Sequence, residues 1–290
     1  MRAEIEAALG EGAVEVVAAR VAAELGDEAG ARALAALCRE RGWVLHPWAG
    51  GEPPSRTLPR EAVLVTPGPG LTGAFALAAD DYYCEVPATM RLAEVGARLR
   101  ETRLWLPFAT AAGPATAVGA LVAEYARNAF APAYGELHRL LFGVSFINDD
   151  GELVSTGRRT MKSVAGYDLS KLFLGSRGRA GLITRVRLRL FPRPREAVFW
   201  RARGRVPDTA ELPRRLCWLE ADGDVLLYAD GHARDVEVVA GQLRLFWPGL
   251  TEASRGDRAP EDFAEAVGVS PRRPAAGAEA VGPGVSDLFI

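Results

Sequence analysis

The sequence predicts an α+β protein built from small units that follow one another along the chain. Apolar residues at helical spacing and short apolar strands alternate before residue 75. Residues 184–190 alternate apolar and charged side chains without exception, which is typical of a half-buried antiparallel strand. Pro192 and Pro194 then mark a boundary before a last group of short strands.

The first unit, residues 1–75, is predicted to contain a helix and two strands. Apolar residues recur at helical spacing over residues 13–40, with a break at 26–28. Residues 42–45 and 62–66 are short apolar stretches that predict strands. The segment between them contains enough Pro and Gly to predict a loop.

The second unit, residues 76–194, is predicted to be mainly an antiparallel sheet with two helices. Asn148-Asp149-Asp150-Gly151 predicts a hairpin turn. The expected strands cover residues 82–86, 141–147, 152–155 and 184–190. The expected helices follow Thr89 and the small-residue loop at 109–119.

The third unit, residues 195–250, is predicted to be a small α+β piece, with strands at 198–203, 225–229 and 236–239 and a helix near 239–246. From residue 251 the chain is rich in Pro, Gly, Ala, Glu and Arg and has few large apolar residues. We therefore expect residues 251–290 to be a disordered tail that regains apolar character only over 285–290.

Composition and charge exclude several classes of function. Apolar residues make up 49% of the 290 residues, and the net charge of −2 gives no electrostatic reason to expect nucleic acid or an anionic membrane as the main partner. No apolar run approaches the roughly 18 residues that cross a bilayer. Acidic residues near the N-terminus do not fit a signal peptide, so we expect a cytoplasmic protein.

Cysteine and histidine patterns predict no metal site. Cys38, Cys84 and Cys217 lie far apart and show no ligand spacing, so we expect buried, reduced core residues. The three histidines are scattered as well.

Lysine and glycine are concentrated in residues 161–184. Only two of the 35 basic residues are lysine, and both, Lys162 and Lys171, lie there. Glycines at 175, 178 and 181 follow. Glycine lets backbone N–H groups approach an anion closely, but the spacing alone is also that of a tight turn without a ligand. The two lysines in the same segment favour the anion-binding interpretation over a tight turn without a ligand.

Three arginines allow two interpretations. Arg185, Arg187 and Arg189 alternate with apolar residues, so they form either a phosphate-binding patch or the solvated face of a sheet. The clean period of two favours the solvated face.

Residues 162–184 resemble the signature of FAD-linked oxidases of the vanillyl-alcohol-oxidase type. Lys-Ser-Val-Ala-Gly-Tyr-Asp-Leu at 162–169 differs from the family's Lys-Asn-Val-Ala-Gly-Tyr-Asp-Leu only at Ser163, and Gly-Ser-x-Gly-x-x-Gly-x-Ile-Thr follows at 175–184. Upstream, residues 113–120 and 134–143 resemble further family motifs in the same order. Within the family, the chain resembles the FAD-binding (E) subunit of the bacterial glycolate oxidase complex.

The resemblance implies a two-subdomain FAD-binding fold of the vanillyl-alcohol-oxidase (PCMH) type, followed by a small, truncated C-terminal α+β piece. FAD would lie between the subdomains. The positions that would line its pyrophosphate are Ala112, Gly113, Pro114, Ala115, Thr116, Val118, Gly119 and Ala120. Gly166, Gly181 and Ile183 would present backbone near the adenosine half. An uncharged loop that leads into a helix N-terminus suits a dianionic group. Lys162 and Asp168 are either ligands or charged braces.

Several residues depart from the family pattern. The family's first phosphate loop reads Arg-Gly-Gly-Gly-Thr, whereas residues 47–52 here read Pro-Trp-Ala-Gly-Gly-Glu. Ala120 replaces a glycine, and residues 124–128 replace small residues. We find no catalytic set for oxidising a 2-hydroxy acid, and His46 beside Pro47 is expected to be structural rather than a flavin attachment point.

Two functions remain open at this point. One is an FAD-binding subunit of a glycolate oxidase-like complex, in which the flavin accepts electrons from a 2-hydroxy acid or relays them. Its partners would be a sister FAD-containing catalytic subunit and an iron–sulfur subunit, which would attach it peripherally to the membrane. The other is a non-catalytic structural subunit with a decayed FAD site. Residues 161–184 favour the first function, and residues 46–52 favour the second. A stand-alone oxidase fits less well, because the substrate domain is short.

Overall fold

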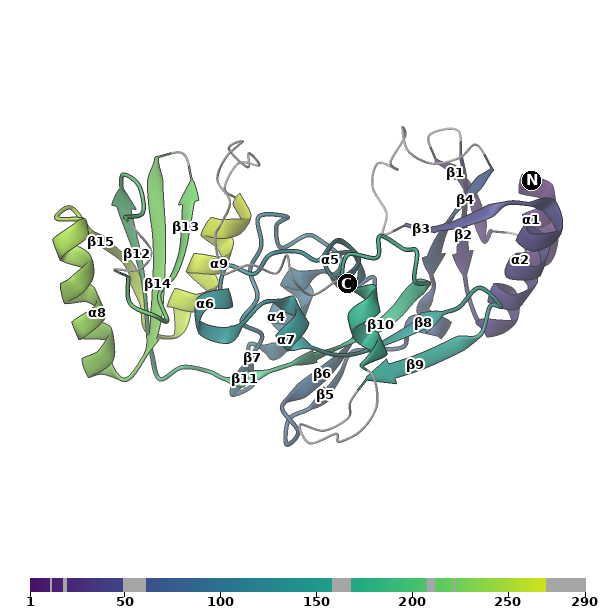
Figure 1. The fold of residues 1–290 in the computed structure, drawn as a ribbon. Helices are drawn as coiled ribbons and strands as arrows, with labels where there is room; N and C mark the ends of the chain where they lie inside the picture. Colours follow the sequence, from purple (N-terminus) through teal and green to yellow (C-terminus); the bar gives the residue numbers. More distant parts are fainter. Residues whose placement is uncertain are drawn as a thin grey trace.

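The computed structural model describes residues 1–10, 12–17, 20–48, 61–157, 168–207, 212–221 and 223–269. Three units lie in a row, in the order in which they occur in the sequence (Figure 1). Among the residues described, no helix combines the length and the apolar character that crossing a bilayer requires.

The N-terminal unit is a four-stranded sheet with helices packed on it. The strands are β1 (Val14–Val17), β2 (Arg20–Leu25), β3 (Val44–Pro47) and β4 (Ala62–Pro67), in the order β1-β2-β4-β3. Both β2 and β3 run parallel to β4, which is almost fully buried. The helices are α1 (Arg2–Leu9), α2 (Glu28–Arg41) and the short α3 (Pro69–Thr72).

The predicted helix over residues 13–40 is wrong in its first half. β1 and β2 form an antiparallel pair there. This stretch is rich in valine, whose branched side chain favours a pleated strand over a helix. Helix α2 begins only after Asp27, whose Oδ1 accepts the N–H of Gly30 (2.8 Å). It ends at Gly42, which has a left-handed φ of 68°.

The central unit contains a five-stranded antiparallel sheet of order β5-β6-β10-β8-β9. Its strands are β5 (Ala76–Ala78), β6 (Tyr83–Pro87), β8 (Leu141–Ile147), β9 (Leu153–Gly157) and β10 (Leu182–Arg189). The helices are α4 (Leu92–Leu99), α5 (Val118–Glu124), α6 (Ala131–Tyr134), α7 (Leu137–Leu140) and the 3-10 helix η1 (Leu169–Phe173). A separate pair joins β7 (Leu104–Trp105) to β11 (Phe191–Pro192).

Two sequence predictions for this unit are confirmed. β8 and β9 form the predicted hairpin, and the N–H of Gly151 donates to the carbonyl oxygen of Asn148 (3.0 Å) in its turn. β10 carries the predicted alternation, with Val186 and Leu188 buried on one face.

The arginines on β10 are less solvated than predicted. Arg185 Nε donates to the carbonyl oxygen of Thr72 (2.7 Å). The Arg187 side chain is only 12% exposed and pairs with Glu85. The guanidinium of Arg189 lies 4.4 Å from the ring centroid of Phe191. The period of two located the sheet face correctly, but it carried no information about the partners that cover that face.

The C-terminal unit is a four-stranded antiparallel sheet between two helices (Figure 1). The strands are β12 (Glu196–Arg203), β13 (Cys217–Ala221), β14 (Asp224–Gly231) and β15 (Thr251–Arg255), in the order β13-β14-β12-β15. Alternate residues of β12 face opposite sides. Phe199 packs with Phe263 of α9 (Ala259–Val269), and Trp200 packs in the cluster that contains Leu243 of α8 (Ala233–Phe246).

Two predictions for the C-terminal region are wrong. Residues 236–239 belong to α8 rather than to a strand. The predicted disordered tail of 251–290 begins instead with β15, the 3-10 helix η3 (Gly256–Arg258) and α9. Ala259, Phe263 and Val267 recur every four residues and are fully buried, so a few apolar side chains at helical spacing are enough to dock α9. Residues 270–290 lie outside the described part of the chain.

Each unit has its own sheet, and the central unit shares apolar contacts with both of its neighbours. Ile147 and Leu182 of the central sheet belong to the same cluster as Leu34 and Val65 of the N-terminal unit. Arg39 and Asp150 form an ion pair across the same junction (2.7 Å). We propose domain limits at 1–75, 76–194 and 195–269, so that the last unit is longer than the predicted 195–250 segment.

The three cysteines are buried and form no disulfide, as predicted. Burial raises the pKa of the Cys38 thiol to about 11 and that of Cys84 to about 12. Both thiols therefore stay protonated at neutral pH and behave as small apolar side chains.

Candidate functional site

The loop at residues 107–117 is fixed by Asn128, which sequence reasoning missed. Asn128 is only 5% exposed. Its Oδ1 accepts the N–H groups of Ala109 (3.2 Å) and Phe130 (3.1 Å), and its Nδ2 donates to the carbonyl oxygens of Pro107 (2.9 Å) and Gly135 (2.9 Å). All of these bonds are internal, so Asn128 shapes the loop rather than binding a ligand.

The loop is also folded back on itself. The N–H of Gly113 donates to the carbonyl oxygen of Thr110 (3.0 Å), and Thr116 Oγ1 donates to the carbonyl oxygen of Ala112 (2.8 Å). Gly113 has a φ of 87°, which other residues rarely adopt. Pro114 and Ala115 are exposed at the tip. The loop is therefore a preformed turn with its tip open to solvent.

The first amides of α5 are not free to bind an anion. The N–H of Val118 donates to the carbonyl oxygen of Met90 (2.9 Å), and that of Gly119 donates to Ala88 (2.8 Å). The predicted helix N-terminus therefore contributes less than the sequence indicated. Among the described residues, no partner is found for the amides of Ala115, Ala117 and Ala120. The loop amides of Ala115 and Ala117 and the α5 amide of Ala120 are therefore candidate donors to an anion.

Gly119 is required for packing. A Cβ placed on Gly119 would lie 2.9 Å from the Cβ of Ala88 and 3.1 Å from its carbonyl oxygen. Any side chain at position 119 would push α5 away from Ala88, the residue that follows β6. The absence of a side chain at this position thus has a structural explanation that needs no ligand.

The turn at residues 175–181 packs against the C-terminal end of α5. The N–H groups of Gly175 and Arg177 donate to the carbonyl oxygens of Val122 (3.1 Å) and Ala123 (3.0 Å). Gly175, Gly178 and Gly181 all have positive φ, at 71°, 81° and 127°. The glycine spacing therefore reflects a backbone that only glycine adopts readily.

This turn also touches the end of β3, where the first loop begins. A Cβ on Gly178 would lie 2.8 Å from Cδ of Pro47, so glycine permits the close approach of the two segments. Gly181 approaches β8 in the same way, since a Cβ there would lie 2.7 Å from the carbonyl oxygen of Ile147. Ile183 follows in β10, where its side chain belongs to the central core.

Three buried polar atoms in these segments lack a hydrogen-bond partner within the described parts of the chain. They are Trp48 Nε1 just after β3, Ser176 Oγ in the glycine turn and Thr184 Oγ1 in β10. Ser176 is 9% exposed and Thr184 is fully buried. Leaving a buried polar atom unpaired is costly, so such atoms are candidates for contact with a ligand.

Lys171 links η1 to the end of α7 and the start of β8. Its Nζ donates to the carbonyl oxygens of His138 and Leu141 (2.6 Å for Leu141), where α7 ends and β8 begins. It also pairs with Asp168 (3.6 Å), which accepts a hydrogen bond from Ser170. A compact ammonium group suits converging carbonyl oxygens better than the planar fork of arginine does. This explains one of the two lysines; Lys162 and the predicted site residue Gly166 lie outside the described residues.

A tyrosine–histidine pair lies beside Lys171. The Tyr125 hydroxyl lies 2.9 Å from Nδ1 of His138. Tyr125 has a φ of 50°, an uncommon conformation for a bulky residue. Burial, followed by the positive charges of Lys171 and Arg139, lowers the pKa of His138. The imidazole is therefore neutral at pH 7, and its tautomer decides whether the Tyr125 hydroxyl or the Nδ1–H group is the donor of this hydrogen bond.

A second polar network joins the central and C-terminal units. Asp230 Oδ2 on β14 accepts hydrogen bonds from the hydroxyls of Tyr134 (2.6 Å) and Tyr228 (2.9 Å). The Asp230 side chain is only 5% exposed, and Arg215 lies 3.6 Å away. Burial, reinforced by the Asp230 charge, raises the pKa of both tyrosines, so both remain hydrogen-bond donors. The sequence spacing of these residues carries no signal that they meet.

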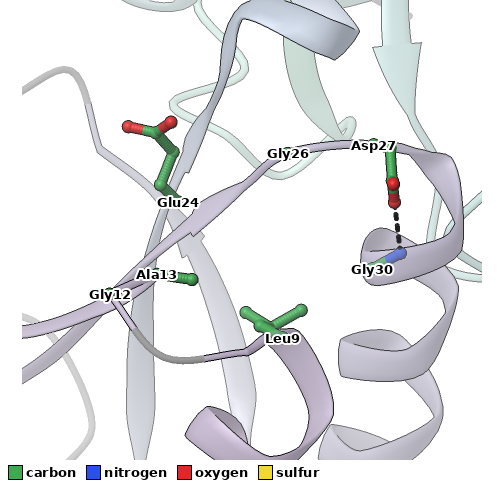
Figure 2. Close-up of a pocket in the computed structure, with 7 residues that line it drawn as sticks. All are labelled: Leu9, Gly12, Ala13, Glu24, Gly26, Asp27 and Gly30. Carbon is green, nitrogen blue, oxygen red and sulfur yellow. Dashed lines mark hydrogen bonds between the residues drawn. The ribbon is translucent and has the colours of Figure 1, made fainter.

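One cavity of about 230 Å³ lies away from these segments. Figure 2 shows it between the end of α1, β2 and the start of α2. Glu24 and Asp27 line it, and Asp27 already accepts the N–H of Gly30. Two carboxylates disfavour a phosphate at this place. The cavity is therefore separate from the predicted cofactor site.

Comparison with known proteins agrees with the family resemblance. Residues 19–157 match the FAD binding domain family (FAD_binding_4). The chain is 33% identical over 105 residues to a mitochondrial D-lactate dehydrogenase [cytochrome] of Arabidopsis thaliana, covering 36% of this chain and 18% of that protein. It is 37% identical over 67 residues to the glycolate oxidase subunit GlcE of Escherichia coli, covering 23% and 19%. The matches thus span about a fifth of the length of these relatives.

Solved structures identify the fold. A xylooligosaccharide oxidase from Myceliophthora thermophila C1 superposes with a TM-score of 0.65 at 13% identity, covering 87% of this chain and 56% of that chain. The predicted fold class, a two-subdomain FAD-binding fold of the vanillyl-alcohol-oxidase type with a small C-terminal unit, is confirmed.

The residues at the site fit FAD. The loop leads into α5 and the turn packs against the end of that helix, and both offer unpaired backbone or hydroxyl donors. The loop and α5 carry no charged side chain between Ala109 and Ala123. A group with many acceptor oxygens, such as a pyrophosphate, would satisfy these donors.

Proposed function

We propose that this chain, whose residues 19–157 form an FAD-binding domain, is the FAD-carrying subunit of a complex that oxidises a 2-hydroxy acid. The observation that carries the proposal is that the 107–117 loop leads into the start of α5 while the 175–181 turn packs against its end, with donors left unpaired on both. When bound, FAD would supply the chemistry of hydride or electron acceptance.

The chain's own residues would bind and orient the cofactor. The amides of Ala115, Ala117 and Ala120 would donate to pyrophosphate oxygens, and the Ser176 hydroxyl would add a donor from the turn. The other predicted positions in 112–120 would shape the loop around them. Gly181 and Ile183 would present backbone to the adenosine half, as predicted from the family. These assignments are part of the proposal.

The names of the relatives support the substrate class and the assembly. One is a D-lactate dehydrogenase and another is a subunit of glycolate oxidase, and both D-lactate and glycolate are 2-hydroxy acids. We propose a sister FAD-containing catalytic subunit and an iron–sulfur subunit as partners, in the cytoplasm and peripheral to the membrane.

One observation favours a second candidate, a structural subunit with a decayed FAD site. Pro47 stands where the family's first phosphate loop begins, and it packs directly against Gly178. Proline has no N–H to donate, so the start of this loop offers less to a phosphate than the family pattern does.

A visible absorbance spectrum of the purified chain separates the two candidates. An electron-carrying subunit shows flavin bands, and acid denaturation releases about one FAD per chain. Adding glycolate or D-lactate anaerobically should then bleach the flavin only when the sister subunit is present. A protein that stays colourless after incubation with excess FAD would reject the first proposal and support the structural role.

A further inference from the structure

Three segments that carry or flank the proposed cofactor contacts are joined in a closed triangle of hydrogen bonds. The first side joins α5 to α7, through the Tyr125 hydroxyl and Nδ1 of His138 (2.9 Å). The second joins α7 and the start of β8 to η1, through Lys171 Nζ and the carbonyl oxygens of His138 and Leu141. We call Tyr125, His138 and Lys171 the brace.

The third side returns from the glycine turn to α5. The amides of Gly175 and Arg177 donate to the last carbonyl oxygens of α5, at Val122 (3.1 Å) and Ala123 (3.0 Å). These amides follow η1 directly in the sequence, because η1 ends at Phe173. A shift of η1 relative to α7 would therefore pull the turn away from α5.

Two features of the brace are hard to explain by packing alone. Tyr125 adopts a left-handed conformation (φ 50°) at the end of α5, a position where glycine is the usual residue. In that conformation its hydroxyl reaches His138. Lys171 is one of only two lysines in a chain that otherwise uses arginine, and its ammonium meets two carbonyl oxygens at a helix end. Tyr125 also lies in the stretch 124–128, which replaces small residues of the family pattern.

The brace links the segments that adjoin the two parts of the proposed cofactor site. α5 follows the 107–117 loop, and the 175–181 turn follows η1, so the brace sets the position of one relative to the other. Donors on two segments bind one ligand well only when the segments are held at the right separation.

We propose that Tyr125, His138 and Lys171 are positioning residues of the FAD site, which hold the loop and the glycine turn at the separation that one FAD requires. They act through the backbone segments they join and need not touch the cofactor. The proposal rests on FAD binding by this chain, and its test measures that binding directly.

The test is the affinity of the apo-protein for FAD, measured by the change in flavin fluorescence, alongside the free energy of unfolding without FAD. Lys171→Met should weaken FAD binding about tenfold, the size typical when a residue that orients a binding group is removed. Lys171→Arg should not restore affinity, because a planar guanidinium does not replace a compact ammonium between two carbonyl oxygens.

Tyr125→Phe keeps the ring and the backbone and removes only the hydroxyl. We expect FAD binding about threefold weaker, and no further loss in the Tyr125→Phe/His138→Phe double variant, because the two residues share one bond. Tyr82→Phe is the matched control. Tyr82 also has a positive φ (55°) and is 44% exposed, and its substitution should leave FAD affinity unchanged.

The outcomes distinguish the inference from the function it rests on. If wild type binds FAD and all the brace variants bind it within twofold of wild type while unfolding more easily, the brace is merely structural and the inference is wrong. If wild-type protein binds no FAD, the cofactor site and the brace proposal fall together. If Lys171→Met does not fold, the milder Tyr125→Phe and its double variant decide the matter.

Discussion

The Asp230 network and the brace both join segments that are distant in the sequence, but the carboxylate at the centre of the first is much less exposed to solvent than the charged groups of the second. Asp230 is 5% exposed, and the two tyrosines that donate to it pack among the aromatic rings of Trp105, Phe130 and Phe263. Lys171 is 30% exposed and its partner Asp168 26%. Water can replace a bond that is lost from the brace, but it cannot easily replace one lost around Asp230.

This difference indicates separate roles. A buried network makes a large contribution to stability, because breaking it leaves unpaired groups in an apolar environment. A half-exposed network changes stability less and can instead govern the position of mobile or ligand-binding segments. We therefore expect substitutions in the Asp230 network to lower mainly the free energy of unfolding, and substitutions in the brace to lower mainly the affinity for FAD.

The largest expected effect comes from removing the buried carboxylate. Asp230→Ala leaves the hydroxyls of Tyr134 and Tyr228 without their acceptor, and it should lower the free energy of unfolding by about 3 kcal/mol. FAD affinity should change less than about twofold. Urea unfolding followed by circular dichroism measures the first quantity, and FAD titration measures the second.

Asp149→Ala is the control, because Asp149 is exposed in the β8–β9 turn. It should shift the free energy of unfolding by no more than about 0.5 kcal/mol. A loss for Asp230→Ala that is no larger than the control's would show that the network is not the stabilising contact we describe.

The next effect is on the cofactor alone. Ala115 is exposed at the tip of the 107–117 loop, and its amide has no partner among the described residues. Ala115→Asp places a carboxylate beside the proposed pyrophosphate and should weaken FAD binding about 30-fold through like-charge repulsion. Stability should be unchanged, as it should be for Ala97→Asp on the exposed face of α4, which should also bind FAD normally.

Two other substitutions are unsuitable for this test. Gly119→Asp would clash with Ala88, so a loss of FAD would report damage to packing. Arg187→Ala is no neutral control, because Arg187 is largely buried and pairs with Glu85. Equal FAD affinity for Ala115→Asp and wild type would contradict our placement of the pyrophosphate.

A smaller effect is expected where the turn meets β3. Gly178→Ala introduces a Cβ at a φ of 81° and 2.8 Å from Pro47, and it should lower the free energy of unfolding by about 2 kcal/mol. Gly223→Ala carries the same backbone strain (φ 83°) but has nothing within 4 Å of its new Cβ. The difference between the two variants, measured by urea unfolding, isolates the contact with Pro47. No difference would mean that the two segments do not meet.

The smallest expected effect is the contribution of His138 to the pH dependence of stability. The pKa of His138 is lowered in the folded protein, so the unfolded chain binds more protons between that value and about 6.5. The stability that His138 contributes is complete above about pH 6.5 and is lost as the pH falls toward the folded pKa. Lys171 and Arg139 favour the neutral imidazole, and Glu136 opposes them.

His138→Phe should therefore flatten the decrease in stability over this range. The change should be below about 1 kcal/mol, because His138 is only half-buried and solvent screens the charges around it. His46, whose pKa is also lowered by burial and by Arg20, would still titrate in this variant. Unfolding measured at several pH values checks this, and an unchanged slope in His138→Phe would assign the pH dependence to other groups.

Local patterns in the sequence predicted the parts of the fold that they determine. The alternation in β10, the turn at 148–151 and the break at Pro192 and Pro194 each specify backbone direction within a few residues. The same reasoning misplaced β1 and β2, because two short valine-rich strands happen to repeat apolar residues at helical spacing. It also missed α9, whose docking depends on the small side chain of Ala259 and the larger Phe263 and Val267 rather than on composition.

The candidate site shows a similar limit. Motif spacing located the loop and the glycine turn, but which amides are free depends on partners such as Met90 and Ala88, which lie in other segments. The roles of Asn128 and Asp230 arise from contacts across 21 and 96 residues of sequence, respectively. No local pattern encodes such contacts.

A crystal structure of the chain grown with FAD tests the central claim most directly. We predict the pyrophosphate within hydrogen-bond distance of the amides of Ala115 and Ala120 and of the Ser176 hydroxyl, with the brace bonds intact. Flavin bound elsewhere, or a pyrophosphate held without the 107–117 loop and the 175–181 turn, would contradict the account.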